Sequence, residues 1–476
     1  MKLMTHKFKI AVGLIFVLFV GCNKTKTPIK LGLMSTAKTV AEKKLEARNV
    51  EFHREIIKIS DNLYTAVGYD VSTINMIIGD NGYVLVDTGS NPKSAKEIKA
   101  EFDKITNLPL KAIILTHSHG DHTRGLETFI EGKEMDIWAL GNFGHEGNFN
   151  KTAGVNFKQR PLRQAGFTLP KELRINNGIA PAIYMGNPPP KKGKNGKPVK
   201  VTKAQSEVFT SALRPNKFFT ENFKSLNIAG ITIELYKAPG ETDDQLFVWL
   251  PKEKALFTGD NFYKSWPNLY AIRGTEYRDV NDWINSLGLM LTKDADYLVG
   301  GHTRPVIGKS EVKEVLTTYR DAVKYVFDKT IEGMNKGMTP DELVDYVKLP
   351  QKYSDKDYLH GYYGRVDWSV RQIFNGYMGW FDGNATTLIP LPKKEEATKM
   401  IALIGGDNDV KNEIIKSINK EEYQWAAQLS DYLLVLYPAN TDYKELKAKA
   451  MVGLGRNVDN ALARNYYLTV AQELRN

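Results

Sequence analysis

From about residue 50 onwards, short apolar runs alternate with segments of helical periodicity. Residues 76–86 hold two strand-like runs separated by Asn81-Gly82, a dipeptide typical of a tight hairpin turn. Residues 92–105 carry apolar positions at helical spacing, and Pro92 stands where a helix tolerates proline best. This alternation predicts an α/β fold of layered sheets flanked by helices.

Beyond about residue 310 the pattern becomes helical. Residues 310–336 are amphipathic, and Thr339-Pro340-Asp341-Glu342 is a capping box that predicts a helix starting at Pro340. Residues 421–437 and 442–454 predict a helical hairpin around Pro438. Five residues at helical spacing in this hairpin are expected to be core rather than ligand contacts: Trp425, Ala426, Leu429, Tyr432 and Leu433.

Between about residues 150 and 205 the pattern breaks. Segment 187–198 is rich in proline and lysine, which suit neither a helix nor a buried strand. Insertions of this length in a compact domain are functional loops or plain surface loops. In the first case the insertion forms one wall of a substrate entrance, with Arg160 or Arg163 near an anion; the sequence leaves both possibilities open.

The amino terminus predicts export. Lys2, Lys7 and Lys9 precede an apolar run over residues 10–21 that is too short for a comfortable membrane span. Residues 18–22 are similar to a lipobox and end on Cys22, the only cysteine of the chain, which predicts lipid attachment there. We expect a signal peptide over residues 1–21 and a lipid-anchored polar tether over residues 22–48; an uncleaved anchor is the alternative.

Composition fits an exported globular protein. The 476 residues are 42% hydrophobic and 11% aromatic, which is enough for two sizeable cores. A net charge of +10 favours anionic substrates or lipid head groups. The lysines are scattered and not interleaved with stacking aromatics, so we expect no nucleic-acid partner.

The strongest chemical signal is Leu115-Thr116-His117-Ser118-His119-Gly120-Asp121-His122. It follows an apolar strand-like run and brings three of the chain's eight histidines together with a carboxylate. Imidazole and carboxylate side chains at one strand end are typical metal ligands. The sequence therefore predicts a metal site that can hold two ions.

Three further loops place a ligand-type side chain directly after an apolar run. They are residues 238–242 with Glu241, 256–261 with Asp260 and 298–302 with His302. With the HxHxDH motif and the upstream segment 83–89 around Asp87, this order resembles the metallo-β-lactamase superfamily. The resemblance implies an αββα sandwich, in which Asp87 orients a metal-bound histidine without binding metal itself.

Carried over by position, the resemblance implies two Zn²⁺ ions per chain. His117, His119 and Glu241 would hold one ion, Asp121, His122 and His302 the other, and Asp260 would bridge them, with Asp121 and Asp260 counted as catalytic. The ligand chemistry also admits Mn²⁺ or Fe²⁺. Glu241 stands where most of the superfamily has histidine. In this respect the chain resembles the alkylsulfatase branch, which has a carboxylate at that position.

The alkylsulfatase resemblance extends over most of the mature chain. Residues 268–274, which begin Asn-Leu-Tyr, and residues 362–364 and 379–384 look like further segments of that family. Arg273 and Asn268 would bind the sulfate group, although a structural ion pair and a turn are their alternatives. The family's helical region is a dimerisation domain, so a homodimer is implied.

One departure concerns residues 364–368. Several alkylsulfatases carry Ser-His shortly after Tyr-Gly, and that histidine helps to hold sulfate, whereas Trp368 stands at this place. Tryptophan replaces neither an acid nor an ion-pair partner. Arg365 or His360 could take over the charge, and His360 could equally be a buried structural residue.

Together these features predict a membrane-anchored lipoprotein of a bacterial cell envelope that hydrolyses alkyl sulfate esters to an alcohol and inorganic sulfate. We expect a catalytic domain over residues 49–310, interrupted by the insertion at about 150–205, and a helical dimerisation domain over 311–476. A hydrolase for β-lactams, lactones or phosphate esters is the alternative within enzymes. A non-catalytic surface lipoprotein is the alternative outside them.

Overall fold

The computed structural model describes residues 37–146, 154, 159–182 and 214–476. The expected signal peptide, Cys22 and the segment 187–198 lie outside these residues. Within the described ranges, no helix combines the length and the apolar character that crossing a membrane requires.

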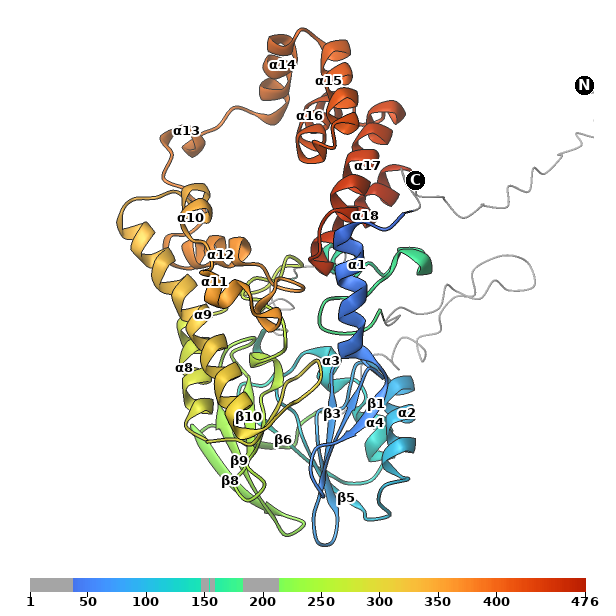
Figure 1. The fold of residues 1–476 in the computed structure, drawn as a ribbon, viewed down its shortest axis with the longest axis vertical. Coiled ribbons are helices and arrows are strands. Elements are labelled where there is room, and N and C mark those ends of the chain that lie inside the picture. The colour runs from blue at the N-terminus through green and yellow to red at the C-terminus, as the bar shows by residue number, and fades with distance from the viewer. Residues whose placement is uncertain (1–36, 147–153, 155–158, 183–213) are drawn as a thin grey trace, which may run out of the picture.

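Two mixed sheets pack face to face (Figure 1). The first has the order β1 (Glu55–Lys58), β2 (Leu63–Val67), β3 (Ile74–Ile78), β4 (Tyr83–Val86), β5 (Leu110–Ile114), β6 (Asp136–Leu140) and β7 (Lys217–Phe219). Its pairs are antiparallel up to β4 and parallel from β4 to β7. The expected hairpin through Asn81-Gly82 joins β3 to β4 and is confirmed.

The second sheet has the order β13 (Val306–Ile307), β12 (Tyr297–Val299), β11 (Ala255–Phe257), β10 (Leu246–Leu250), β9 (Ile231–Lys237) and β8 (Phe223–Ile228). Only β11 and β12 pair in parallel. One apolar core lies between the sheets, where Val84 and Ile114 of the first sheet meet Leu235 and Val248 of the second.

Helices cover both outer faces. On the first sheet lie α2 (Pro92–Phe102) and α4 (Leu126–Ile130), and α2 begins with Pro92 after an Asn91 cap as expected. On the second lie α8 (Val280–Leu291) and α9 (Lys309–Asn335). The αββα sandwich is therefore confirmed. The helix α9, expected to open the helical domain, buries Val315 and Tyr319 against the second sheet and completes the sandwich.

The remaining helices form an arch above the sandwich (Figure 1). They are α10 (Pro340–Tyr346), α11 (Gln351–Ser354), α12 (Val366–Met378), α13 (Ala385–Leu388), α14 (Lys393–Ile404), α15 (Asp407–Asn419), α16 (Tyr423–Leu436), α17 (Thr441–Arg456) and α18 (Ala461–Leu474). The capping box of Thr339 and Glu342 starts α10, as predicted.

The expected hairpin is formed by α16 and α17, and its core contains Ala426, Leu429 and Leu433. Tyr432 is partly buried at the rim of this core. The expectation that Trp425 belongs to the core is wrong, because its side chain is 44% exposed. Helical spacing identifies the buried face of α16, on which Ala426 and Leu429 lie, but Trp425 lies at the edge of that face and lines a groove.

A helix at the amino-terminal end, α1 (Val40–Ala47), packs against the carboxy-terminal helices (Figure 1). The Glu42 carboxylate lies 3.1 Å from the Arg456 guanidinium and 3.4 Å from that of Arg464. Leu45 is fully buried. The tether expected over residues 22–48 therefore stops before Val40, because its last residues are helical and bury an ion pair.

The described part of the insertion is packed, not loose. Its helix α6 (Gln159–Ala165) lies against α18, where Arg163 forms an ion pair with Glu473 at 2.6 Å. Leu169 and Leu173 are buried with side chains of α17 and α18. Arg160 donates to the Tyr270 hydroxyl at 3.3 Å. These residues therefore connect the sandwich loop that carries Tyr270 to the helices α17 and α18.

Candidate metal centre

The ligand-type side chains follow strand ends at one edge of the sandwich. His117, His119, Asp121 and His122 follow β5, and His119 caps the short helix α3 (Gly120–Thr123). Glu241 follows β9, Asp260 lies on a turn (Gly259–Asn261) after β11, and His302 follows β12. Side chains up to 185 residues apart along the chain, from His117 to His302, therefore meet in one place.

Two groups of possible metal ligands form there. In each group the ligand atoms lie within 4.8 Å of one another: His117, His119 and Asp260 form one, and Asp121, His122 and His302 form the other. The Asp260 carboxylate reaches both groups. Its Oδ2 lies 3.2 Å from His302 Nε2 and 3.7 Å from His117 Nε2, and its Oδ1 lies 3.1 Å from His122 Nε2. Asp260 thus has the geometry of a bridging ligand.

Three imidazoles are oriented by a protein oxygen at Nδ1. The contacts are His122 to Asp87 Oδ2 at 2.8 Å, His302 to Val71 O at 2.7 Å and His117 to Thr116 Oγ1 at 3.1 Å. Such a contact fixes the ring and leaves Nε2 for a metal. The backbone of Asp87 has φ 63°, a strained value for aspartate, and this conformation serves the contact with His122.

The donor atoms fit a divalent cation. Four ligand atoms are buried and have no hydrogen-bond partner. They are Nε2 of His117, Nε2 of His122, Oδ1 of Asp260 and Oε2 of Glu241. Burial holds the pKa of His117 well below its usual value, so this ring is neutral. Burial opposes ionisation of Asp260, but the surrounding histidines outweigh it and hold its pKa well below the usual range. Burial opposes the charged forms of His122 and His302, but Asp260, together with Asp87 at His122, outweighs this effect and raises the pKa of both rings. A metal requires neutral imidazoles and ionised carboxylates, so a cation that binds these two rings displaces their protons.

Glu241 lies beside the groups rather than in either of them. Its side chain is buried, and Oε1 forms an ion pair with Arg278 Nη1 at 2.6 Å. Burial raises the pKa of Glu241, and the Arg278 charge opposes this shift. Because Oε2 has no partner, one oxygen is free to contact an ion. The assignment of Glu241 as a ligand stays a prediction.

Arg273 lies directly beside the first group. Its Nη2 is 3.4 Å from His119 Nε2, and its backbone N–H donates to Gln164 Oε1 of the insertion at 2.8 Å. Asn268 is buried, its Oδ1 lacks a partner, and its N–H donates to the Tyr263 hydroxyl at 2.7 Å. Arg273 therefore offers a guanidinium at the ligand cluster.

Two charged residues of the centre, Arg278 and Glu146, were not identified from the sequence. Arg278 pairs with Glu241 and also donates to the carbonyl of Asn268 at 2.5 Å. The Glu146 carboxylate lies 3.1 Å from His119 Nε2. Glu146 follows β6 at the same sheet edge as the other ligand loops, which is a signal that could have identified it. Arg278 carries no comparable signal.

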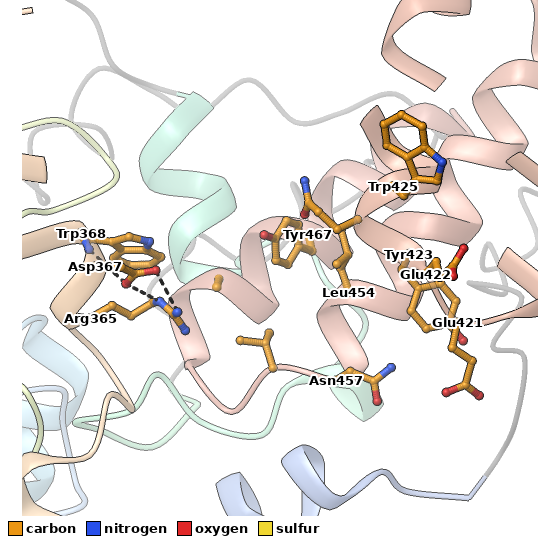
Figure 2. A pocket seen from close by; sticks show the side chains of 13 residues that line it. Arg365, Asp367, Trp368, Glu421, Glu422, Tyr423, Trp425, Leu454, Asn457 and Tyr467 are labelled. Carbon is orange, nitrogen blue, oxygen red and sulfur yellow. Dashed lines mark hydrogen bonds and ion pairs between the residues drawn. The ribbon is translucent and has the colours of Figure 1, made fainter. Parts of the chain in front are cut away.

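The candidate substitutes for the family histidine at Trp368 lie in ion pairs elsewhere. Arg365 contacts both carboxylate oxygens of Asp367 at 2.8 and 2.9 Å, and His360 Nε2 lies 2.9 Å from Asp459 Oδ2. Arg365, Asp367 and Trp368 line a groove of about 720 Å³ that extends to α16 and α18, as Figure 2 shows. His360 thus has a structural partner.

Replacing Gly301 with alanine is expected to disturb the bridging carboxylate. A Cβ at this position would lie 2.0 Å from Asp260 Oδ1 and 2.8 Å from the Gly259 backbone, so Asp260 must move. We expect metal affinity to fall on the order of 10- to 100-fold, as for losses of ligand-orienting contacts. Chelator competition measures this. Gly288→Ala is the control, because nothing lies within 4 Å of its Cβ; equal affinity of Gly301→Ala and wild type would contradict the bridging geometry.

Known proteins share both parts of this architecture. A model of the metallo-β-lactamase superfamily matches residues 67–302, and a model of the alkyl sulfatase dimerisation region matches residues 339–476. A linear primary-alkylsulfatase of a Pseudomonas strain is 34% identical over 412 residues, covering 84% of this chain and 73% of the relative. An (R)-specific secondary-alkylsulfatase of Pseudomonas is 30% identical, covering 88% of this chain and 62% of the relative.

A solved structure extends the likeness to three dimensions. The stereoselective inverting sec-alkylsulfatase Pisa1 of Pseudomonas superposes with a TM-score of 0.79 at 28% identity, over 91% of this chain and 67% of that one. The arrangement of the sandwich and the helical arch is therefore shared with an alkylsulfatase of known structure. By sequence and by architecture, the chain belongs to the alkylsulfatases, a branch of the metallo-β-lactamase superfamily.

Proposed function

We propose that this protein is a binuclear zinc hydrolase that converts an alkyl sulfate ester and water into an alcohol, inorganic sulfate and a proton. The observation that carries the proposal is the guanidinium of Arg273 beside a cluster of metal ligands that Asp260 joins into one centre. A cation suited to a sulfate oxyanion thus stands next to the place where a metal would act.

The residues divide the chemistry among them. His117, His119 and Glu241 would hold one Zn²⁺ and Asp121, His122 and His302 the other, with Asp260 between them; Mn²⁺ or Fe²⁺ suits the same donors. When bound, two such ions supply a hydroxide near neutral pH and neutralise developing negative charge. Arg273 orients the sulfate through a forked pair of hydrogen bonds, and Asn268 supplies a neutral donor. The packed insertion holds Arg273 through Gln164.

Sulfate release from alkyl sulfates of graded chain length tests the proposal. Activity should disappear after chelation and return with Zn²⁺, because the donor set is incomplete without metal. A series from short to long chains identifies the preferred alcohol. Faster turnover of a chromogenic β-lactam, a lactone or a phosphate ester than of every sulfate ester would overturn the assignment. Metal-free protein with undiminished activity would do the same.

We also propose that the protein is a homodimer. The region matched by the dimerisation model exposes large apolar side chains between α12 and α14, namely Tyr377, Met378, Trp380, Leu388, Ile389, Leu391 and Leu403. Ile389 is 89% and Trp380 75% exposed, and such a concentration on one arm is typical of a protein contact surface. Sedimentation equilibrium should give twice the chain mass. A monomer at micromolar concentration would contradict this.

Membrane anchoring at Cys22 on an exported bacterial lipoprotein is proposed from the sequence alone. Cys22→Ser should move the protein from the membrane fraction to the soluble fraction or leave it with an uncleaved leader, because the thioether-linked lipid is the expected anchor. Fractionation followed by mass measurement of the amino terminus is the test. The control is Cys22→Ser lacking residues 2–21, which should be soluble. Unchanged membrane partition of Cys22→Ser would place the anchor elsewhere.

A further inference from the structure

We propose that Glu146 is a positioning residue that fixes the metal-facing atom of His119 and holds Arg273 beside it. The proposal rests on the function proposed above and adds to it a carboxylate that joins the metal ligands to the anion-binding guanidinium.

Glu146 contacts both partners with different oxygens. Its Oε2 lies 3.1 Å from His119 Nε2. Its Oε1 accepts from the Thr275 hydroxyl at 2.8 Å and lies 3.6 Å from Arg273 Nη1. The side chain is 14% exposed. Thr275 thereby fixes the carboxylate plane, so its two oxygens point to two functional neighbours.

The neighbours of Glu146 all offer protons to its carboxylate. The Thr275 hydroxyl donates to Oε1, the Arg273 guanidinium lies 3.6 Å from Oε1, and the His119 ring lies 3.1 Å from Oε2. An ionised carboxylate only accepts hydrogen bonds. His119 must therefore carry its proton on Nε2 and present the lone pair of Nδ1.

This orientation is opposite to that of the three other imidazoles. Those rings are held at Nδ1 and offer Nε2. His119 is held at Nε2, so a metal in the first group would meet Nδ1 instead. Without Glu146, both tautomers and both ring orientations become available to His119. Metal binding must then restrict the ring to one tautomer and one orientation, and the free energy of this restriction lowers the metal affinity.

The same carboxylate accounts for the close approach of Arg273 to His119. The guanidinium Nη2 and the ring Nε2 lie 3.4 Å apart, although both carry protons when Nε2 is protonated. A negative charge between them offsets the repulsion of the two donors. Glu146 therefore keeps the guanidinium near the ligands before any sulfate ester binds.

Zinc affinity of the purified full chain, measured by competition with a chromogenic chelator, tests the role of Glu146. Glu146→Ala should bind zinc about 10- to 100-fold more weakly, as for losses of other ligand-orienting contacts. Glu146→Gln keeps an acceptor oxygen and should recover most of this affinity. The control is Glu97→Gln, which removes a carboxylate that pairs with Arg54 at 2.9 Å and belongs to no group of possible metal ligands among the described residues; it should bind zinc like wild type.

Two results would overturn the proposal. Wild-type zinc affinity in Glu146→Ala would show that the contact orients nothing, and equal losses in Gln and Ala would make Glu146 a direct ligand. Nitrogen-15 spectra of labelled histidine supply a second readout, because His119 should carry its proton on Nε2 in the zinc form of wild type and lose that signature in Glu146→Ala. None of these measurements needs ester turnover, so an inactive wild type would refute the proposed function and leave this inference standing.

Discussion

Asp260→Asn is expected to abolish ester hydrolysis while the protein stays folded. Asp260 is the only carboxylate that reaches both ligand groups among the described residues, and an amide cannot bridge two cations as a carboxylate does. With the paired ions lost, the water that must attack keeps a pKa far above neutral, so we expect kcat/KM to fall on the order of a thousandfold or more.

Elemental analysis and circular dichroism check this expectation together. Asp260→Asn should hold less than two equivalents of metal and keep a wild-type spectrum, because the sandwich core lies between the sheets and not at the ligand loops. Asp294→Asn is the control, since Asp294 pairs with Lys309 at the surface. Full activity in Asp260→Asn would show that hydrolysis does not require two metal ions bridged by Asp260.

Arg273→Ala should lower kcat/KM for sulfate esters by roughly a hundredfold, since a charge-assisted fork in a partly buried site contributes a few kcal/mol. A rise in KM alone would mean that Arg273 binds the substrate and the transition state equally. A lower kcat would mean that Arg273 binds the transition state more strongly than the substrate, as charge develops on the departing sulfate. Arg273→Lys should recover only part of the loss, because an ammonium has no fork.

Metal content separates this effect from damage to the centre. Arg273→Ala should keep the wild-type metal stoichiometry, because the guanidinium approaches His119 without belonging to either ligand group. Arg54→Ala is the control, since Arg54 pairs with Glu97 at the surface at 2.9 Å. Near wild-type efficiency of Arg273→Ala on its best sulfate ester would make Arg273 structural.

The ligand groups could be predicted from the sequence because they depend on local rules. Each ligand follows an apolar strand, and the strand ends of a layered sheet meet at one edge. His117 and His302 are therefore brought together by topology alone. The hairpin through Asn81-Gly82 and the capped start of α10 are equally local, and the structure contains both.

Other features depend on approaches between distant elements that no local pattern records. Glu146 and Arg278 have their roles only because their loops lie against those of His119 and Glu241. Trp425 shares the helical spacing of the core residues of α16, yet its side chain is 44% exposed while the adjacent Ala426 is buried. The helix α1 is polar enough to resemble a tether, yet Glu42 finds two arginines more than 400 residues away.

That last contact has a consequence for the order of biogenesis. Glu42 and Arg456 are separated by 414 positions, so this ion pair cannot form until nearly the whole chain has been synthesised. At about 5–20 residues per second, this delay is roughly 20–80 s. Before then α1 can make only its earlier contacts, such as the hydrogen bond from Asn176 to the Leu45 carbonyl at 2.6 Å. Pairing of Glu42 with its two arginines is therefore a late step, which completes the docking of α1 only after the carboxy-terminal helices exist.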